Sequence, residues 1–227
     1  VICLPASIDN NLPGSELAVG ADTALESVVR AIDALKQAAR ASRRTFIVET
    51  MGRWCGFLAL MGGLSAGAER VYLHEEGMTL AGLNEDVQEM VEGFKRGRRF
   101  HLALRNEQAS VGYTTEFLRE LFTEESQGLF DVRTMILGHL QQGGNPTPFD
   151  RVHAARLAAH SIDWLTGQVL AGRSDWRYVS MVNGKMGTAP IRSFPDVVDM
   201  EFRRPREQWW MALRPIMREL AQPPASS

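Results

Sequence analysis

Four short apolar segments of the chain each run directly into polar residues, and this recurring pattern constrains the fold more than any other feature. The segments cover residues 1–4, 44–50, 101–104 and 133–138. Stretches with helical periodicity separate them, and strands that alternate with helices indicate a mainly parallel sheet. Parallel strands end on the same side of a sheet, so the loops that follow them can converge on one ligand. The sequence therefore predicts an α/β fold, a mainly parallel sheet flanked by helices, with a site beyond the carboxyl ends of its strands.

Helical periodicity is clearest over residues 17–41, where apolar side chains recur every three or four positions. A second long helix is expected over residues 151–170. The stripe that we expect this helix to bury consists of Ala155, Ala158, Ile162 and Leu165. The same kinds of pattern predict further helices over 54–64, 79–95, 113–121 and 207–220, and strands over 70–73 and 178–182. We expect the last of these strands at a sheet edge.

The composition is that of an ordinary globular protein. Hydrophobic residues make up 44% and charged residues 23% of the 227 residues, enough for one large domain or two small lobes. A net charge of −2 implies no general attraction to nucleic acid. The two cysteines lack metal-ligand spacing, so a reducing, cytoplasmic location is expected, and no apolar run has the length of a membrane span. Because Val1 already lies in a predicted strand, we expect the chain to be a piece of a longer one.

Asp9, which follows the first apolar segment, is the first candidate for chemistry. A carboxylate at the carboxyl end of a strand can act as a general base or face a metal ion. Asp and Asn also commonly cap turns by accepting hydrogen bonds from their own backbone. On this segment alone, the catalytic and the turn-capping interpretations stand side by side.

Further candidates lie beside the other strand ends. Arginine can bind phosphate through two parallel hydrogen bonds, although a scattered arginine more often forms a surface ion pair. The arginines beside strand ends or turns are Arg44, Arg53, Arg133 and Arg203. His139 could pack in the core or contact a ligand, and Glu107 could accept a sugar hydroxyl or neutralise a guanidinium. The pair Gly143-Gly144 could admit a phosphate, whereas such pairs usually mark turns.

Several segments, taken together and in this order, resemble the 6-phosphofructokinase family. They are residues 5–11 (PASIDNN), 51–53 (MGR), 138–144 (GHLQQGG) and 149–151 (FDR). The resemblance covers the chain from Val1 to about residue 220, and segments 104–107, 113–115 and 207–210 are similar to the C-terminal half of the long, duplicated eukaryotic members. It implies a two-lobed fold and an enzyme that transfers the ATP γ-phosphate, with Mg²⁺, to the 1-hydroxyl of fructose 6-phosphate in glycolysis.

The resemblance also implies roles for particular residues. Asp9 would be the base that takes the proton of the sugar hydroxyl, and Arg53 would be the second catalytic residue. Residues 51–53 would line the sugar and the reacting phosphate, and Glu107 would hold sugar hydroxyls. The other positions implied in substrate binding are Ser7, Ile8, Asn11, Met51, Gly52, His139 and Gln142, the last two in the 6-phosphate pocket. Ser7 stands where the family usually has Thr.

Three arginines match family positions outside this set. Arg44 and Arg133 match arginines that reach the sugar phosphate of a neighbouring subunit or half. Arg203 matches an arginine of the bisphosphate site in regulatory halves. The partners implied are fructose 6-phosphate or a fructose bisphosphate and a second copy or paired half-subunit, with no nucleic acid and no membrane.

The sequence departs from the family pattern at several positions. Asn11 replaces the second Asp of the usual catalytic loop, which removes a charge near the metal, and Gln142 replaces an Arg of catalytic pockets. The glycine-rich nucleotide loops would lie before Val1, so most ligands of ATP and Mg²⁺ are expected upstream and no metal ligand is assigned within the chain. Asp9 and Arg53, by contrast, stand where regulatory halves usually carry Ser and Gly.

These mixed features leave three interpretations: a catalytic unit, a regulatory half that binds a fructose bisphosphate, and a non-catalytic assembly partner. By resemblance, residues 1–15 would end a nucleotide lobe, residues 16–142 would form a sugar-phosphate lobe, and residues 143–227 would return to pack on the first lobe. The isolated chain is expected to lack kinase activity.

Overall fold

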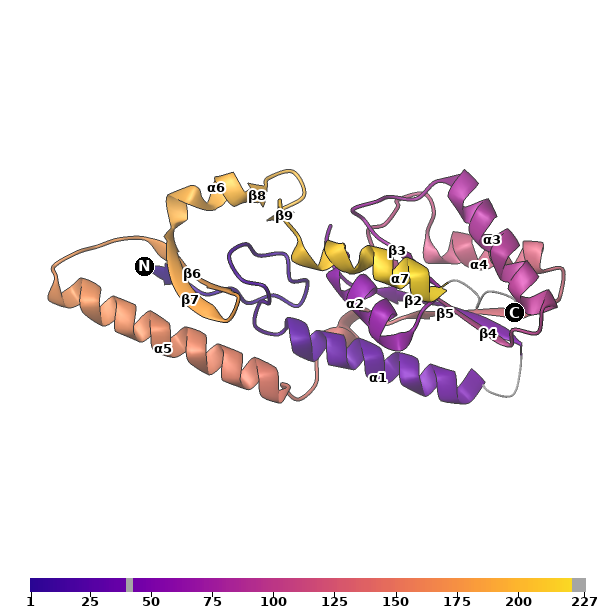
Figure 1. Cartoon of the computed structure of the whole chain (residues 1–227), viewed down its shortest axis with the longest axis horizontal. Coiled ribbons are helices and arrows are strands. Elements are labelled where there is room, and N and C mark those ends of the chain that lie inside the picture. The colour runs from indigo at the N-terminus through magenta and orange to yellow at the C-terminus, as the bar shows by residue number, and fades with distance from the viewer. Residues whose placement is uncertain (40–42, 222–227) are drawn as a thin grey trace.

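The structure, a computed structural model, describes residues 1–39 and 43–221 of the chain. It is an elongated α/β molecule, with a larger sheet and its helices at one end and a smaller sheet at the other (Figure 1). The larger sheet has the strand order β3-β4-β2-β5, and all of its neighbouring strands are parallel. Its strands are β2 (Arg44–Thr50), β3 (Arg70–Tyr72), β4 (Phe100–Asn106) and β5 (Asp131–Ile136). The predicted α/β fold with a parallel sheet is therefore confirmed.

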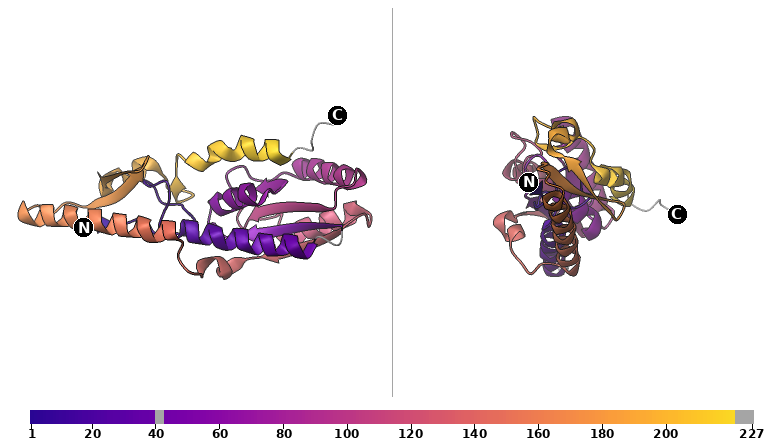
Figure 2. Two further views of the ribbon diagram at one scale, coloured as in Figure 1. Left: turned by 60° about the horizontal axis from the view of Figure 1, so that its bottom comes forward. Right: turned by 90° about the vertical axis from the view of Figure 1, so that its left-hand side faces the viewer.

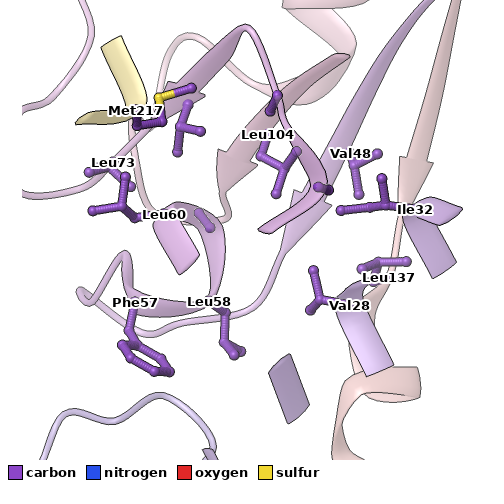
Figure 3. Packing of buried hydrophobic residues seen from close by; sticks show 14 of the residues in the cluster. Val28, Ile32, Val48, Phe57, Leu58, Leu60, Leu73, Leu104, Leu137 and Met217 are labelled. Atoms are coloured by element: carbon purple, nitrogen blue, oxygen red, sulfur yellow. The ribbon is translucent and has the colours of Figure 1, made fainter. Parts of the chain in front are cut away.

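Side chains alternate between the two faces of this sheet, as the period of a strand requires. Phe46 and Val48 join the core under α1 (Ala21–Ala39) and α2 (Phe57–Ala66), a cluster shown in Figure 3. Ile47, between them, joins the core on the opposite face. The helices that cover this second face are α3 (Leu80–Lys95) and α4 (Thr115–Ser126). The middle strands β2 and β4 are buried on both faces, which explains their nearly continuous apolar runs, whereas the edge strand β5 has no buried residue.

The smaller sheet has the order β1-β6-β7 and joins the start of the chain to its later part. Its strands are β1 (Ile2–Cys3), β6 (Arg177–Val182) and β7 (Lys185–Pro190). β6 runs parallel to β1 and antiparallel to β7, so it is the middle strand. The expectation of an edge strand over 178–182 is therefore wrong, because β7 pairs with it through a tight turn in which Asn183 and Gly184 both have positive φ.

The long helix α5 (Pro148–Leu170) buries a different face from the one expected. Ala155 and Ala158 are exposed, and Ile162 is 63% and Leu165 39% exposed. The buried positions are Asp150, His153, Leu157 and Ser161. Asp150 and His153 are turned inward because they hydrogen bond to the segment around the start of α1, His153 donating to the carbonyl of Leu17 over 2.9 Å. Polar anchoring, rather than the apolar stripe, sets the rotation of this helix.

Helices α1 and α5 meet with their N-terminal ends facing each other and continue along one side of the molecule (Figure 2). α1 begins at Ala21 rather than at residue 17, and the last two residues of the helix expected over 17–41 lie outside the described part.

The C-terminal segment crosses back over the molecule through a series of short elements. In chain order they are α6 (Phe194–Val197), β8 (Val198–Asp199), β9 (Arg204–Pro205), a 3₁₀ helix at Trp209–Leu213 and α7 (Arg214–Ala221). Trp210 is buried against Phe57 of α2, whereas Trp209 is 44% exposed. This return brings residues 203–208 next to the loop that follows β2. Within the described residues, no helix combines the length and the apolar character that crossing a membrane requires.

Candidate functional site

The loop at residues 51–53, directly after β2, is the point on which three other segments converge. Its three consecutive backbone N–H groups donate, in order, to Gln141 over 3.3 Å, to Glu107 over 3.2 Å and to Asp9 over 3.2 Å. These acceptors come from the 3₁₀ helix at Gly138–Gln142 after β5, from the loop after β4 and from the loop after β1. The predicted convergence of strand-end loops is therefore present.

The Asp9 carboxylate is partly buried and faces the loop rather than its own turn. Burial raises the pKa of Asp9, while the N–H group of Arg53 and the charge of its guanidinium lower it by less. Asn10 links this loop to the following segment, since its side chain accepts from Ala18 N over 2.8 Å and donates to the carbonyl of Glu16 over 2.9 Å. Asn10 has a φ of 53°, a conformation that Asn tolerates better than most residues. The side chain that caps the backbone of this turn is that of Ser7, which accepts from the Asp9 N–H.

Ser7 and Asn11 stabilise the Asp9 loop from within. The Ser7 hydroxyl donates to the Asn11 side-chain oxygen over 2.8 Å and accepts from the Asp9 N–H over 3.2 Å. Ile8 lies beside them and packs partly against the core under α1 and α2. The hydroxyl and the amide thereby fix the direction in which the Asp9 side chain leaves the backbone.

Glu107 is the second carboxylate of the site and lies in a loop that a buried arginine organises. Arg105, only 2% exposed, donates to the carbonyls of Tyr113 over 3.1 Å, Glu107 over 3.2 Å and Ser110 over 2.6 Å, and to the carboxylate of Glu49 over 2.9 Å. Burial raises the pKa of Glu107, the N–H of Gly52 lowers it, and the charges of Asp9 and Glu49 raise it further. The two site carboxylates therefore affect each other's protonation.

Gly52 cannot be replaced without disturbing the loop. Its φ is 137°, and a Cβ atom there would lie 2.2 Å from the carbonyl oxygen of Cys55 and 2.7 Å from the Asn106 side-chain nitrogen. That nitrogen donates to the carbonyls of Gly52 over 2.8 Å and Cys55 over 3.1 Å. The tight turn after Arg53 therefore depends on the missing side chain and on the amide of Asn106.

The 3₁₀ helix after β5 turns one glutamine inward and its neighbour outward. Gln141 is 1% exposed and reaches the loop at residues 51–53, whereas His139 and Gln142 are exposed. Beside them lies a cavity of about 370 Å³ that Ile8, Gln141 and Gln142 line together with residues from the starts of α1 and α5. His139 and Gln142 thus border the site from the solvent side.

The arginines singled out in the sequence fall into two groups. Arg53 is in the loop, and the guanidinium of Arg203 lies 5.7 Å from the ring centre of Trp54, one residue further on. Arg44 and Arg133 lie in the first halves of β2 and β5, away from the loop at residues 51–53. Their guanidinium nitrogens lie 4.0 Å (Arg44) and 3.6 Å (Arg133) from the carboxylate of Asp131. With about 3.3 Å per strand residue, Arg44 is separated from the loop by about 20 Å. The structure does not bring Arg44 and Arg133 to the Asp9 site of the same chain.

The described residues offer little for a nucleotide-bound metal ion. Among them, no group of three or more His, Cys, Asp or Glu side chains is arranged to hold a metal. Magnesium usually takes one or two carboxylates together with substrate phosphates, and here Asp9 could supply one while the Asn11 side-chain oxygen accepts from Ser7.

Sequence reasoning missed the residues that hold the site loops in place. Gln141, Arg105 and Asn106 lie within the quoted motifs, but a motif does not reveal which neighbour points inward. Glu75 and Arg204 lie outside those motifs and reach the loop only through the fold. A charged residue within an otherwise apolar strand, as Arg105 is in β4, was the one available signal.

Comparison with solved structures first defines the class of fold. Phosphofructokinase from Saccharomyces cerevisiae matches with a TM-score of 0.91 and 34% identity, over 97% of this chain and 31% of the yeast chain. The T-state phosphofructokinase of Pichia pastoris matches with a TM-score of 0.86 and 32% identity, over 97% of this chain and 27% of the other. The chain has a phosphofructokinase fold.

Sequence comparison then defines the family. A sequence description of the family named Phosphofructokinase matches residues 1–165. The human ATP-dependent 6-phosphofructokinase of muscle type is 41% identical over 232 aligned residues, which cover 97% of this chain and 30% of the human protein. The chain belongs to the phosphofructokinase family, as its motifs suggested. It spans a little under a third of the length of such relatives.

Proposed function

We propose that the chain supplies the sugar side of the active site in an ATP-dependent 6-phosphofructokinase, and that Asp9 is its catalytic base. The observation that carries this proposal is that two carboxylates contact the loop at residues 51–53. Asp9 accepts from the N–H of Arg53, and Glu107 accepts from the N–H of Gly52. The raised pKa of Asp9 supports it, because a base acts best when its pKa lies closer to the working pH. The muscle-type relatives, whose names specify ATP, support the choice of phosphate donor.

In the proposed reaction, the oxygen of the sugar 1-hydroxyl attacks the γ-phosphorus of ATP while the bond to the bridging oxygen of ADP breaks. Asp9 takes the proton of the hydroxyl, and the Arg53 guanidinium neutralises charge on the phosphoryl group as it moves. Mg²⁺ carried by ATP would neutralise the nucleotide phosphates. The product is fructose 1,6-bisphosphate, which places the complete protein in glycolysis in the cytoplasm.

The remaining residues bind the sugar phosphate in this proposal. Glu107 accepts sugar hydroxyls, which requires that it share or give up the N–H of Gly52. His139 and Gln142 border the 6-phosphate. The other contacts come from Ser7, Ile8, Asn11, Met51 and Gly52. Arg44, about 20 Å away along its strand, and Arg133, about 16 Å away, would serve the site of a neighbouring subunit or paired half in an oligomer. We also propose the division into segments 1–15, 16–142 and 143–227.

A regulatory half that binds a fructose bisphosphate is the second candidate. Asn11 and Gln142 favour it, since each replaces a charged residue expected in a catalytic pocket. Arg203, beside Trp54, could hold the second phosphate. Asp9 opposes it, because an ionised carboxylate close to a second phosphate would repel that phosphate in a partly buried site.

Calorimetric titration separates these candidates. We expect a complete protein that contains this segment to bind fructose 6-phosphate more tightly than fructose 2,6-bisphosphate, and Asp9→Ser to shift this preference toward the bisphosphate. Asp163→Ser, on the exposed side of α5, is the matched control and should change neither affinity. In a complete protein that contains this segment, Asp9→Ser should lower turnover at least about a hundredfold, with a much smaller effect on sugar binding. Tighter bisphosphate binding that Asp9→Ser leaves unchanged would support the regulatory half instead.

A further inference from the structure

The turn at residues 52–56 links the candidate site to α2, and its backbone is strained. Trp54 has a φ of 55°, a left-handed conformation that is uncommon for a bulky residue and costs of the order of 1 kcal/mol. Such a turn keeps its shape only if neighbouring groups hold it. From the side of β4, Asn106 does so through the carbonyls of Gly52 and Cys55. The opposite side is held by residues that the proposed reaction does not use.

Glu75, which follows β3, holds the end of this turn. Its side chain is 6% exposed, and both carboxylate oxygens lie 3.1 Å from the backbone nitrogen of Gly56, the N-cap residue directly before α2. Gln208 donates to the same carboxylate over 3.0 Å. A negative charge at this position also complements the positive end of the helix dipole. The fit is close, since a Cβ atom on Gly56 would lie 2.8 Å from the carboxylate.

Arg204 of β9 completes the arrangement from a point 150 residues away in the sequence. One nitrogen of its guanidinium lies 2.7 Å from the carbonyl oxygen of Trp54, 3.1 Å from the Glu75 carboxylate and 2.9 Å from Nδ1 of His74. The side chain is 13% exposed, and its guanidinium lies 5.0 Å from the ring centre of Phe202. Arg204 therefore ties the strained residue directly to the buried carboxylate.

We propose that Glu75 and Arg204 form a positioning pair, which fixes the turn at residues 52–56 so that the N–H groups of Gly52 and Arg53 face Glu107 and Asp9. The pair acts through the backbone and does not touch the reacting groups. Its catalytic consequence rests on the proposed function, whereas the positioning itself does not. The C-terminal segment thereby sets the geometry of a loop that follows β2.

A simple structural role would have a different signature. If the pair only anchors residues 200–210, its loss should loosen that segment or the whole fold, with no particular effect on the loop. If it positions the loop, backbone amides at residues 51–56 should open more often while those of β2 and β4 stay protected. Local opening of this kind is what amide hydrogen exchange measures.

The test compares Arg204→Gln and Glu75→Gln with Arg206→Gln in the full chain by hydrogen exchange and mass spectrometry. Arg206 lies on the same segment as Arg204 and has an exposed side chain. Arg206→Gln therefore removes the same charge as Arg204→Gln. We expect peptides covering residues 51–56 to exchange at least about tenfold faster in the first two variants and unchanged in the third. Arg204→Lys, which keeps the charge, should fall between. Unchanged exchange in the loop, or equal acceleration in β2 and β4, would overturn the proposal.

Titration with fructose 6-phosphate adds the functional readout. We expect Arg204→Gln to weaken binding by about tenfold and Arg206→Gln to leave it unchanged, because a mobile loop must be ordered before it binds. If a complete protein that contains this segment binds no fructose phosphate, the proposed function is wrong, and the exchange measurement on the chain still decides whether the pair positions the loop. Equal affinity of Arg204→Gln and the unsubstituted chain would overturn its role in sugar binding.

Discussion

At the residue scale, the Asp9 carboxyl shows how a functional group can oppose stability. Its pKa is raised in the folded chain, so the folded state binds more protons than the unfolded state between the ordinary pKa of 3.8 and the raised value. Stability therefore falls as the pH rises through this window. We expect Asp9→Asn, which can still accept from the Arg53 N–H, to be more stable than the unsubstituted chain at pH 7.

Urea unfolding at pH 7 and pH 3 measures this difference, which should vanish near pH 3, where Asp9 is protonated in both states. Asp163→Asn, at an exposed position on α5, should have no effect at either pH. A less stable Asp9→Asn variant at pH 7 would show that the charge of Asp9 is well compensated in the fold.

The buried pair of Arg105 and Glu49 is the second residue-scale case. Arg105 is 2% exposed and satisfies three carbonyls as well as this carboxylate, and Glu49 also accepts from Thr115. Removing one partner leaves the other charge buried and unpaired, so Arg105→Met should lower the free energy of unfolding by about 3–5 kcal/mol. Arg119→Met breaks a surface pair on α4 and should cost less than about 1 kcal/mol. Equal costs for the two substitutions in urea unfolding would contradict this account.

At the element scale, two helix N-termini face each other, and carboxylates lie between them. Asp150, in the first turn of α5, accepts from the N–H groups of Gly20 over 3.0 Å and Thr23 over 2.8 Å at the start of α1. Asp22 of α1 in turn accepts from the Thr147 hydroxyl at the start of α5. The negative charges complement both positive helix ends and satisfy N–H groups that have no partner within their helix.

We expect Asp150→Ala to lower the free energy of unfolding by about 2–3 kcal/mol, since it removes a cap and leaves buried donors unpaired. Asp163→Ala, on the exposed side of the same helix, should change it by less than about 0.5 kcal/mol. Urea unfolding followed by circular dichroism measures both. If Asp150→Ala leaves the free energy of unfolding unchanged, water replaces the carboxylate at no cost.

At this scale the structure also shows which features could be predicted from the sequence. The middle strands β2 and β4 of the larger sheet were predictable because burial on both faces makes them apolar runs, and the convergence of the loops followed from parallel pairing. The rotation of α5 could not be predicted, because Asp150 and His153 turn inward to partners that lie more than a hundred residues away in the sequence. The central place of β6 was missed for a similar reason: nothing in residues 178–182 shows that two strands pair with it.

At the scale of the whole molecule, the proposed function assigns to this chain the sugar side of the site, and among the described residues no cluster of His, Cys, Asp or Glu is arranged to hold a metal. Phosphoryl transfer depends on holding nucleotide, metal and acceptor in line, so one side alone gives little rate enhancement. We therefore expect the isolated 227-residue chain to form no fructose 1,6-bisphosphate from ATP and fructose 6-phosphate. Asp9→Ser protein is the control for a contaminating kinase. Product formation that the unsubstituted chain supports and Asp9→Ser abolishes would contradict the expectation.

The stability of the whole molecule should depend on pH through His101 in the centre of the larger sheet. The side chain is 3% exposed, and its Nδ1 atom has no hydrogen-bond partner among the described residues. Burial, together with the charges of Arg98 and Arg70, lowers its pKa from 6.5 to about 3. Between these values the unfolded chain binds a proton that the folded chain does not, so stability rises with pH across this window and is lost on acidification.

Each unit of pKa difference corresponds to 1.36 kcal/mol. When the pH falls from 7 to 4, this one group should therefore lower the free energy of unfolding by about 3 kcal/mol. His101→Leu removes both the proton-binding group and the unpaired nitrogen, and its unfolding free energy should therefore fall less over the same range. His139→Asn, at an exposed position, should keep the full dependence of the unsubstituted chain. Urea unfolding of the three proteins at several pH values gives the slopes. The same slope for His101→Leu and the unsubstituted chain would mean that His101 becomes protonated without unfolding, through local opening around β4.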